Sequence, residues 1–420
     1  MSVGLESQDH PPMITDPTRL TLTSRWIHAH FSLDSTPVRM RERACGTIKK
    51  RCAAAWETTL RAMEKRVISA GIKEEKQGRP GLGSGPVRGQ SELHPGRAEE
   101  VYRHWPRPDL IMSDGAYGVG GFPGDPRTPD GLDEWYAPHM PVWSERAHSA
   151  TTLWFWNTEI GWATVHPLLA ASGWEYVQTI IWDKGIGHIA GNVNGATIRR
   201  LPTVTEVCVF YRRRLELPGV AGPLGAPQWL RAEWQRAGLP LYRANEACGV
   251  KNAASRKYLT QDWLWYFPPA EMMARLVDFA NTHGAPEGRP YYSIDGRRPV
   301  TGAQWARLRH PWSHEHGLTN VWSHPPLNGT ERYRGKGRRV APRVHNPGKN
   351  ATAHLNQKPL EFMRRIVRLA TERGDVVWEP FGGLCSAAVA AVELGRQAYG
   401  AEPDPWFAEL ASERLDAIER

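Results

Sequence analysis

Apolar residues gather in strand-length runs in two separate parts of the chain. Four runs lie in the first part, at residues 109–112, 151–156, 176–182 and 205–211, with a helical pattern at 159–172. Near the C-terminus, runs at 375–378 and 398–402 alternate with helical patterns at 360–372, 386–394 and 405–419. This alternation predicts an α/β fold with a doubly wound, mostly parallel sheet that helices cover on both faces.

The remaining chain interrupts or precedes this pattern. Residues 36–71 have helical spacing and are followed at 76–96 by a segment rich in Gly, Pro, Ser and Arg, which predicts a linker. Residues 215–350 lose the alternation and are rich in Arg, Trp, His, Gly and Pro. We therefore expect four parts: a helical extension with a linker (1–98), one half of the α/β domain (99–214), an inserted region (215–350) and the second half (351–420).

Composition narrows the class of protein. The 420 residues include 53 Lys and Arg against 44 Asp and Glu, a net charge of +9, which suits a nucleic-acid partner. The sequence has no apolar run of 18 residues, so we expect no membrane span. Five cysteines form no C-x-x-C pair, which predicts a reduced, cytoplasmic setting and no metal site.

A glycine turn near the C-terminus carries the most specific chemistry. The apolar run at 375–378 leads into Gly382-Gly383, and small residues then open a helix. A tight strand-to-helix turn lets backbone N–H groups approach a ligand closely. About twenty residues later the next strand ends in Glu402, where nucleotide-binding units place an acid that binds ribose hydroxyls. The spacing alone also fits an ordinary turn and a surface acid.

Three segments resemble the motifs of one enzyme family. The letters W-E-P-F-G-G at 378–383 resemble the D-P-F-x-G-x-G turn of S-adenosylmethionine-dependent DNA amino-methyltransferases. The letters H-L-N-Q-K-P at 354–359 resemble their H-x-x-Q-K-P element, and S-D-G-A-Y-G at 113–118 stands in the place of their D-P-P-Y catalytic loop. The order of the three is similar to that of the beta group of these enzymes.

The resemblance implies a mechanism and a set of site residues. A methyl group would pass from S-adenosylmethionine to the exocyclic amino group of a base flipped out of duplex DNA. The Asp114 carboxylate and the Gly115 carbonyl would accept the amino N–H bonds, and Tyr117 would stack on the base. Gly115-Ala116 replaces Pro-Pro, so we expect a catalytic loop that is more mobile before substrate binds.

The residues implied for the cofactor are Gln357, Lys358, Glu379, Phe381, Gly382, Gly383 and Glu402, with Gln357 and Lys358 near its methionine end. Cys385 stands where the family has the last glycine of the turn.

The target base stays open between adenine and cytosine. In the family an acid at the first loop position accompanies adenine N6 and a serine accompanies cytosine N4. Asp114 follows Ser113, which slightly favours adenine. The usual setting is restriction–modification, with a cognate restriction endonuclease as the functional partner. A catalytically silent DNA-binding protein with a methylase fold is the alternative of another class, and RNA methylation is a weaker one.

The inserted region supplies candidate DNA contacts. Residues 244–259 predict two helices with a turn at Gly249, which fits a DNA-binding helix-turn-helix and an ordinary helical hairpin equally well. In the first case Lys251, Asn252, Ser255 and Arg256 would face the groove. A basic loop is either a phosphate clamp or a solvated charge run; its cations are Arg332, Arg334, Lys336, Arg338 and Arg339. We expect Trp312, Trp322 and the aromatic segment 263–267 in the core of this region.

Overall fold

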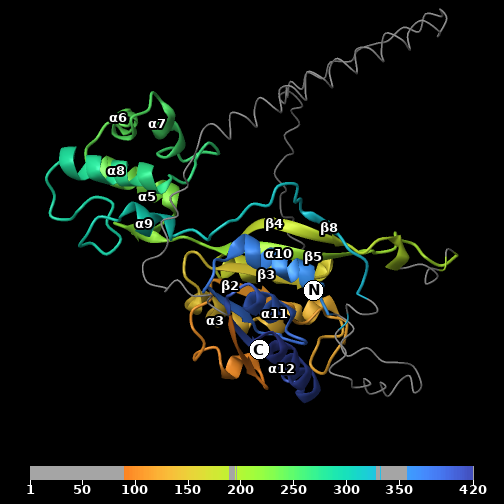
Figure 1. The fold of residues 1–420 in the computed structure, drawn as a ribbon. Helices are drawn as coiled ribbons and strands as arrows, with labels where there is room; N and C mark the ends of the chain where they lie inside the picture. The colour runs from red at the N-terminus through yellow and green to blue at the C-terminus, as the bar shows by residue number, and fades with distance from the viewer. Residues whose placement is uncertain (1–88, 189–193, 195, 328–331, 333–356, 420) are drawn as a thin grey trace, which may run out of the picture. The chain divides into compact units, whose positions relative to one another are not determined.

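The computed structural model describes residues 89–188, 194, 196–327, 332 and 357–419, which carry colour in Figure 1. The predicted helix at 36–71 and most of the basic loop, including Arg334, Lys336, Arg338 and Arg339, lie outside these residues. None of the described helices combines the length and apolar character that crossing a bilayer requires.

An eight-stranded sheet forms the centre of the α/β part of the chain. Its order is β1-β10-β9-β2-β3-β5-β4-β8, and β5 alone runs antiparallel to its two neighbours. The strands are β1 (Gln90–His94), β2 (Leu110–Ser113), β3 (Thr152–Asn157), β4 (Trp174–Asp183), β5 (Thr205–Arg213), β8 (Val321–Ser323), β9 (Val376–Glu379) and β10 (Gln397–Ala401). The mostly parallel α/β fold predicted from the sequence is confirmed, and each predicted apolar run falls on one of these strands.

Strand β1 was not predicted. It pairs in parallel with β10 from Gln90 to His94, and the Glu402 N–H donates to the His94 carbonyl at 3.0 Å. The linker prediction for 76–96 is therefore wrong at 90–94. An edge strand with mixed polar and half-buried residues has no apolar run to reveal it, and the Gly- and Pro-rich surroundings dominated the pattern.

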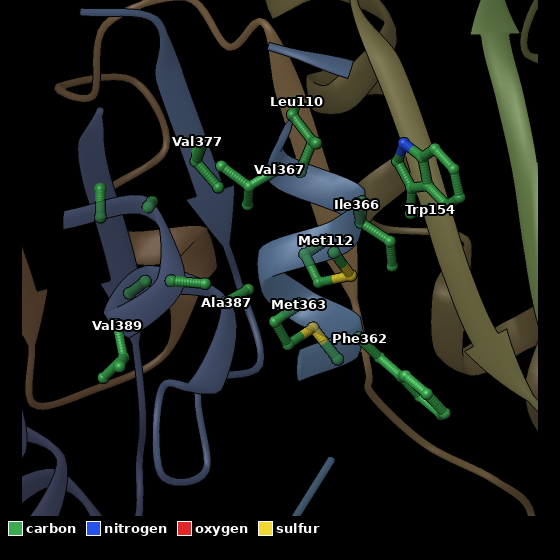
Figure 2. Packing of buried hydrophobic residues seen from close by; sticks show 14 of the residues in the cluster. Leu110, Met112, Trp154, Phe362, Met363, Ile366, Val367, Val377, Ala387 and Val389 are labelled. Carbon is green, nitrogen blue, oxygen red and sulfur yellow. The ribbon is translucent and has the colours of Figure 1, made fainter. Parts of the chain in front are cut away.

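Side chains of successive strand residues pack on opposite faces of the sheet. Leu110 and Met112 belong to one core cluster, whereas Ile111 between them belongs to the other. In Figure 2, Phe362, Ile366 and Val367 of helix α10 (Leu360–Ala370) point from the helix toward this first face. The spacing of four between 362 and 366 and three between 363 and 366 places these side chains on one side of the helix, so α10 buries that stripe against the strands.

Helices cover both faces, as predicted. The described helices beside the sheet are α2 (Leu132–Tyr136), α3 (His139–Arg146), α4 (Glu159–Ala171), α10 (Leu360–Ala370), α11 (Ser386–Glu393) and α12 (Pro405–Glu419). Residues of α10, α11 and α12 contribute to one core cluster, and residues of α2, α3 and α4 to the other. Short 3-10 turns lie at Ala98–Glu100, Pro129–Gly131 and Ile186–His188.

The inserted region has a core of its own. Its elements are β6 (Leu217–Gly219), β7 (Gly222–Leu224), α5 (Ala226–Arg236), α6 (Arg243–Cys248), α7 (Ala253–Lys257), α8 (Ala270–His283) and α9 (Gly302–Ala306). Trp229, Trp234 and Trp305 are fully buried there, and the Phe267 ring stacks on Trp305 with 4.4 Å between ring centroids.

Three tryptophans expected in that core lie elsewhere. The Trp263 side chain is 89% exposed, on the loop between α7 and α8. Trp322 lies on β8 and is buried in the core of the sheet. Trp312 stacks on Phe210 of β5 with 5.5 Å between centroids. Aromatic composition predicts burial on average, but the placement of each ring depends on which element its segment joins.

Candidate active site

A cavity of about 460 Å³ lies where β2, β9 and β10 end. These strands are parallel, so their carboxyl ends meet at one edge of the sheet, where open α/β sheets bind ligands. Of the residues predicted for the site, those that line this cavity are Asp114, Gly115, Gln357, Lys358, Glu379, Phe381, Gly382, Gly383 and Glu402. Tyr117 and Ala116 lie beside it and are not among its lining residues.

The Asp114 carboxylate is held through one of its two oxygens. Lys358 Nζ lies 2.8 Å from Asp114 Oδ1, and the Tyr117 hydroxyl donates to the same oxygen at 2.9 Å. Asp114 Oδ2 accepts no hydrogen bond from the residues that the structure describes, so it is available to a ligand in the cavity. Burial raises the pKa of Asp114, and Lys358 lowers it in part.

Glu206, on β5, is a site residue that sequence reasoning missed. Its Oε1 lies 2.5 Å from the Tyr117 hydroxyl and 3.0 Å from Lys358 Nζ, and its Oε2 lies 2.8 Å from Lys184 Nζ. Burial alone would raise the pKa of Glu206, but Lys358 and Lys184 bring it below its usual value. A lone acid inside an otherwise apolar strand run was the signal that could have revealed it.

The catalytic loop is supported by a second carboxylate. Asp125 accepts backbone N–H bonds at 3.2 Å from Tyr117, 2.9 Å from Gly118, 3.3 Å from Val119 and 2.8 Å from Gly121. These four bonds argue against the mobility that the loss of two prolines predicted. The Ala116 carbonyl is fixed as well, since Asn157 Nδ2 donates to it at 2.8 Å.

Gly115 is a position of close approach. A Cβ there would lie 2.7 Å from the Phe381 ring and 2.8 Å from the Tyr136 hydroxyl oxygen. The loop after β2 and the turn after β9 therefore touch at Gly115 and Phe381, and any side chain at 115 would separate them.

Two buried glutamates organise the glycine turn. Glu379 Oε1 accepts from the Ala387 N–H at 3.0 Å and Oε2 from the Ala388 N–H at 2.7 Å, which caps α11. Glu402 Oε2 accepts from the Gly383 N–H at 2.7 Å and Oε1 from the Asp404 N–H at 2.8 Å. Burial raises the pKa of each glutamate to about 7, although these backbone bonds lower it in part. Each carboxylate oxygen keeps a lone pair for a further donor.

Cys385 does not obstruct the cavity. Its backbone has φ of 51°, the left-handed region that the family's glycine suits, yet its side chain is fully buried in the core of the sheet. A Cβ on Gly382 would lie 2.7 Å from Cys385 Sγ and 3.0 Å from the Ala401 carbonyl oxygen. The sulfur thus packs beneath the turn, and Gly382 must remain a glycine.

The cavity carries more acids than bases. Four of its lining residues are carboxylic acids, Asp114, Glu379, Glu402 and Asp404, whereas Arg97 and Lys358 are its two bases. Apolar walls come from Trp135, Met363, Phe381, Leu384 and Phe407. Such a site can bind a ligand that combines hydroxyl groups, a flat apolar part and a positive charge. In the described part of the chain, no three His, Cys, Asp or Glu side chains are grouped as metal ligands would be.

The predicted helix pair of the inserted region is present as α6 and α7. Gly249 between them adopts φ of 67° and ends α6. Lys251, Asn252 and Arg256 are exposed, whereas Ser255 is half-buried and its hydroxyl oxygen accepts a hydrogen bond from Asn245 Nδ2 at 3.0 Å. Both helices are short, and whether they bind DNA stays a prediction. Of the basic loop only Arg332 is described.

Parts of this chain are similar in sequence to known proteins. Type II methyltransferase M2.MboI of Moraxella bovis is 33% identical over 99 residues, which are 24% of this chain and 30% of that protein. M2.DpnII of Streptococcus pneumoniae is 35% identical over 67 residues, 16% of this chain and 25% of that protein. The chain thus matches less than a third of the length of these relatives.

A structural comparison and a family model were also matched to this chain. The M1.HpyAVI–SAM complex aligns with 78% of this chain and 100% of its own, at a TM-score of 0.41 and 13% identity. The family model described as DNA methylase matches residues 109–413, which include the catalytic loop, the glycine turn and both acids that organise it. On that match, the chain belongs to the DNA methylase family.

Proposed function

We propose that this protein transfers a methyl group from S-adenosylmethionine to the exocyclic amino group of a base in duplex DNA. One observation carries the proposal: Asp114, with a free carboxylate oxygen, and the glycine turn with Glu402 line the same cavity. A hydrogen-bond acceptor for an amino group therefore lies beside a site suited to a nucleoside. The relatives M2.MboI and M2.DpnII are type II methyltransferases, which supports the same activity.

The residues present fit S-adenosylmethionine. About 460 Å³ falls within the roughly 300–1,000 Å³ of small-molecule sites. Glu402 would accept bonds from the ribose hydroxyls, and Phe381 and Leu384 would contact apolar parts of the molecule. The excess of carboxylates favours a positively charged sulfonium. When bound, S-adenosylmethionine supplies an electrophilic methyl group.

Asp114 and Gly115 would make the amine reactive. The lone pair of an exocyclic amino nitrogen is delocalised into the ring, so the nitrogen is a weak nucleophile. Asp114 Oδ2 and the Gly115 carbonyl would accept its two N–H bonds and favour a pyramidal nitrogen. On gaining the methyl group that bound S-adenosylmethionine would supply, the nitrogen would release one proton, along its hydrogen bond to Asp114 Oδ2 or to water. Tyr117 would stack on the flipped base.

Adenine N6 is the favoured target, since an acid stands at the first loop position; cytosine N4 is the alternative. A catalytically silent DNA-binding protein remains the candidate of another class, because Gly115-Ala116 departs from the family's Pro-Pro. In the proposed setting, cytoplasmic restriction–modification, methylation protects DNA from a cognate endonuclease.

The inserted region would hold the DNA. Lys251, Asn252 and Arg256 are exposed and offer phosphate and base contacts, with Ser255 beside them. Trp263 lies on a neighbouring loop that the Tyr266 N–H closes by donating to the Lys257 carbonyl at 2.7 Å. An ordered loop with an exposed indole and flanking cations suits stacking against bases.

Transfer of a radiolabelled methyl group to plasmid DNA, followed by nucleoside analysis, tests the proposal. N6-methyladenine is the expected product, and N4-methylcytosine would replace the adenine assignment. DNA binding without incorporation at saturating S-adenosylmethionine would overturn the enzyme and support the silent binder.

A further inference from the structure

We propose that Glu206 is a positioning residue for the transfer step: it shares Lys358 and Tyr117 with Asp114 and so keeps Asp114 Oδ2 a strong acceptor for the amino group. The inference rests on the proposed function. It concerns a residue on β5, a strand separate from the loop and turn that line the cavity.

The sharing is visible in the distances. Lys358 Nζ lies 2.8 Å from Asp114 Oδ1 and 3.0 Å from Glu206 Oε1. The Tyr117 hydroxyl lies 2.9 Å from the same Asp114 oxygen and 2.5 Å from the same Glu206 oxygen. A phenol has one proton, so at any moment Tyr117 donates to one carboxylate only. Two acids therefore compete for the same two donors.

Removing Glu206 would mainly change the hydrogen bonding of the Asp114 carboxylate. Lys358 is 3% exposed and lies 5.1 Å from the Tyr117 ring centroid, so its ammonium group has little room to leave. Without Glu206, Asp114 would be the one carboxylate left of the two that Lys358 and Tyr117 share. A carboxylate that is neutralised more strongly on Oδ1 is a weaker acceptor on Oδ2.

The charges around Asp114 agree with this assignment. Burial raises the pKa of Asp114, Lys358 lowers it and Glu206 raises it again. The other titratable groups that interact with Asp114 are Tyr117, Tyr136, Cys208 and Glu379. Glu206 itself interacts with Lys184 and His188 on the side of β4. The charges of Lys184 and Lys358 thus balance those of Asp114 and Glu206. Loss of Glu206 would leave an excess of positive charge around Asp114.

The test compares Glu206→Gln with Glu206→Asp and a matched control. Glu175→Gln, on β4, removes an acid whose partner is Arg212 at 2.9 Å, in a half-exposed ion pair remote from the proposed reaction. Single-turnover methylation is measured against pH, together with S-adenosylmethionine affinity and the thermal midpoint. We expect Glu206→Gln to slow transfer roughly 10- to 100-fold, as loss of a residue that orients a reactive group does.

The acid limb of the pH profile should also move down by about one unit, because Asp114 loses a like charge. Affinity for S-adenosylmethionine should stay within about twofold, since Glu206 is not among the residues that line the cavity. Glu206→Asp should recover part of the rate, and Glu175→Gln should behave as the wild type. The inference would be overturned if the pH profile of methylation in Glu206→Gln were the same as in the wild type. It would also be overturned if the loss of rate were matched by a fall in the thermal midpoint of unfolding.

A measurement without turnover separates this inference from the proposed function. The carboxyl ¹³C signal of Asp114, identified by its loss in Asp114→Asn, is titrated in the wild type and in Glu206→Gln. A lower pKa in the variant supports the coupling even if the protein methylates nothing, and the same pKa in both contradicts it. Absence of methylation by the wild type would overturn only the proposed function.

Discussion

Lys358 Nζ lies 2.8 Å from Asp114 Oδ1, although 244 positions separate the two residues. This contact joins the Q-K-P element to the catalytic loop. The family resemblance placed Lys358 near the methionine end of the cofactor, and the structure adds a second relationship, since the same ammonium group also contacts Glu206. One buried cation therefore lines the cavity and contacts both carboxylates.

Replacing Lys358 by methionine should destabilise the fold. Asp114 and the buried Glu206 would then lose the cation that they share, while Lys184 would remain beside Glu206, and breaking a buried ion pair costs about 3–5 kcal/mol. The loss should shrink at low pH, because Asp114 has a raised pKa and becomes neutral first. Urea unfolding at several pH values measures it, and equal stability to the wild type at neutral pH would contradict the prediction.

Asp114→Ala should abolish methyl transfer and leave S-adenosylmethionine affinity nearly unchanged. The loss removes one acceptor for the amino group, and loss of a preorganised electrostatic contact costs about 100- to 1,000-fold in turnover. Lys358 keeps Glu206 as a partner, so the fold should persist. Radiolabel transfer and calorimetric titration check the two parts. A variant with wild-type activity would refute the role of Asp114.

Glu402→Gln should weaken S-adenosylmethionine binding about 10- to 100-fold, since hydrogen bonds to charged groups contribute roughly 1.5–3 kcal/mol. In the wild type, affinity should rise from pH 6 to pH 8 as Glu402, whose pKa burial raises to about 7, loses its proton and becomes a better acceptor. In the Glu402→Gln variant, the affinity for S-adenosylmethionine should depend much less on pH.

Glu379→Gln is the control for that titration. The pKa of Glu379 is also raised to about 7, and both glutamates accept two backbone N–H bonds, but the bonds from the ribose hydroxyls are assigned to Glu402 alone. Its replacement should therefore leave the pH dependence of binding largely in place. If Glu379→Gln removed the dependence and Glu402→Gln retained it, the assignment to Glu402 would be wrong.

The packing of Cys385 beneath Gly382 predicts coupled stability effects. Gly382→Ala places a methyl group 2.7 Å from Cys385 Sγ, so we expect a cost of about 1–3 kcal/mol from overpacking. The cost should fall in a Cys385→Ala background, although the Ala401 carbonyl still limits the space. Chemical denaturation of the wild type, the two single variants and the double variant measures the coupling free energy between the two positions. Strict additivity would show that the sulfur does not restrict the turn.

Cys385→Ala by itself should leave S-adenosylmethionine affinity within about twofold of the wild type, because the sulfur is fully buried and the cavity's lining excludes it. Calorimetry measures the affinity. A marked gain on removing the thiol would mean that Cys385 does hinder the ligand.

Trp263→Ala should weaken DNA binding by about 1–3 kcal/mol, the usual contribution of one aromatic ring stacked on a base. Trp263→Phe should retain much of the affinity. Val220→Ala is a matched control, since Val220 is 97% exposed in the same inserted region. Binding to a fluorescent duplex is measured at fixed salt. Equal affinity of Trp263→Ala and wild type would exclude the loop from the interface.

The sequence by itself determined the fold class and most strands, because buried parallel strands have continuous apolar runs and the amphipathic helices repeat every three to four residues. It also identified the residues of the glycine turn and the acid at 402, since tight turns restrict which residues fit. It missed β1, whose edge position requires no apolar run, and misplaced Trp263, Trp312 and Trp322.

Only the tertiary structure decided how the site is connected. Glu206 lies within a strand that reads as ordinary core, and no spacing relates it to Asp114 or Lys358. Cys385 stands where the family has a glycine, and only the packing showed that its side chain lies in the core. Hydrophobic patterning reports which side of an element is buried. Distances between polar groups that are far apart in the chain follow from strand order and packing, which bring Asp114, Glu206 and Lys358 to one edge of the sheet.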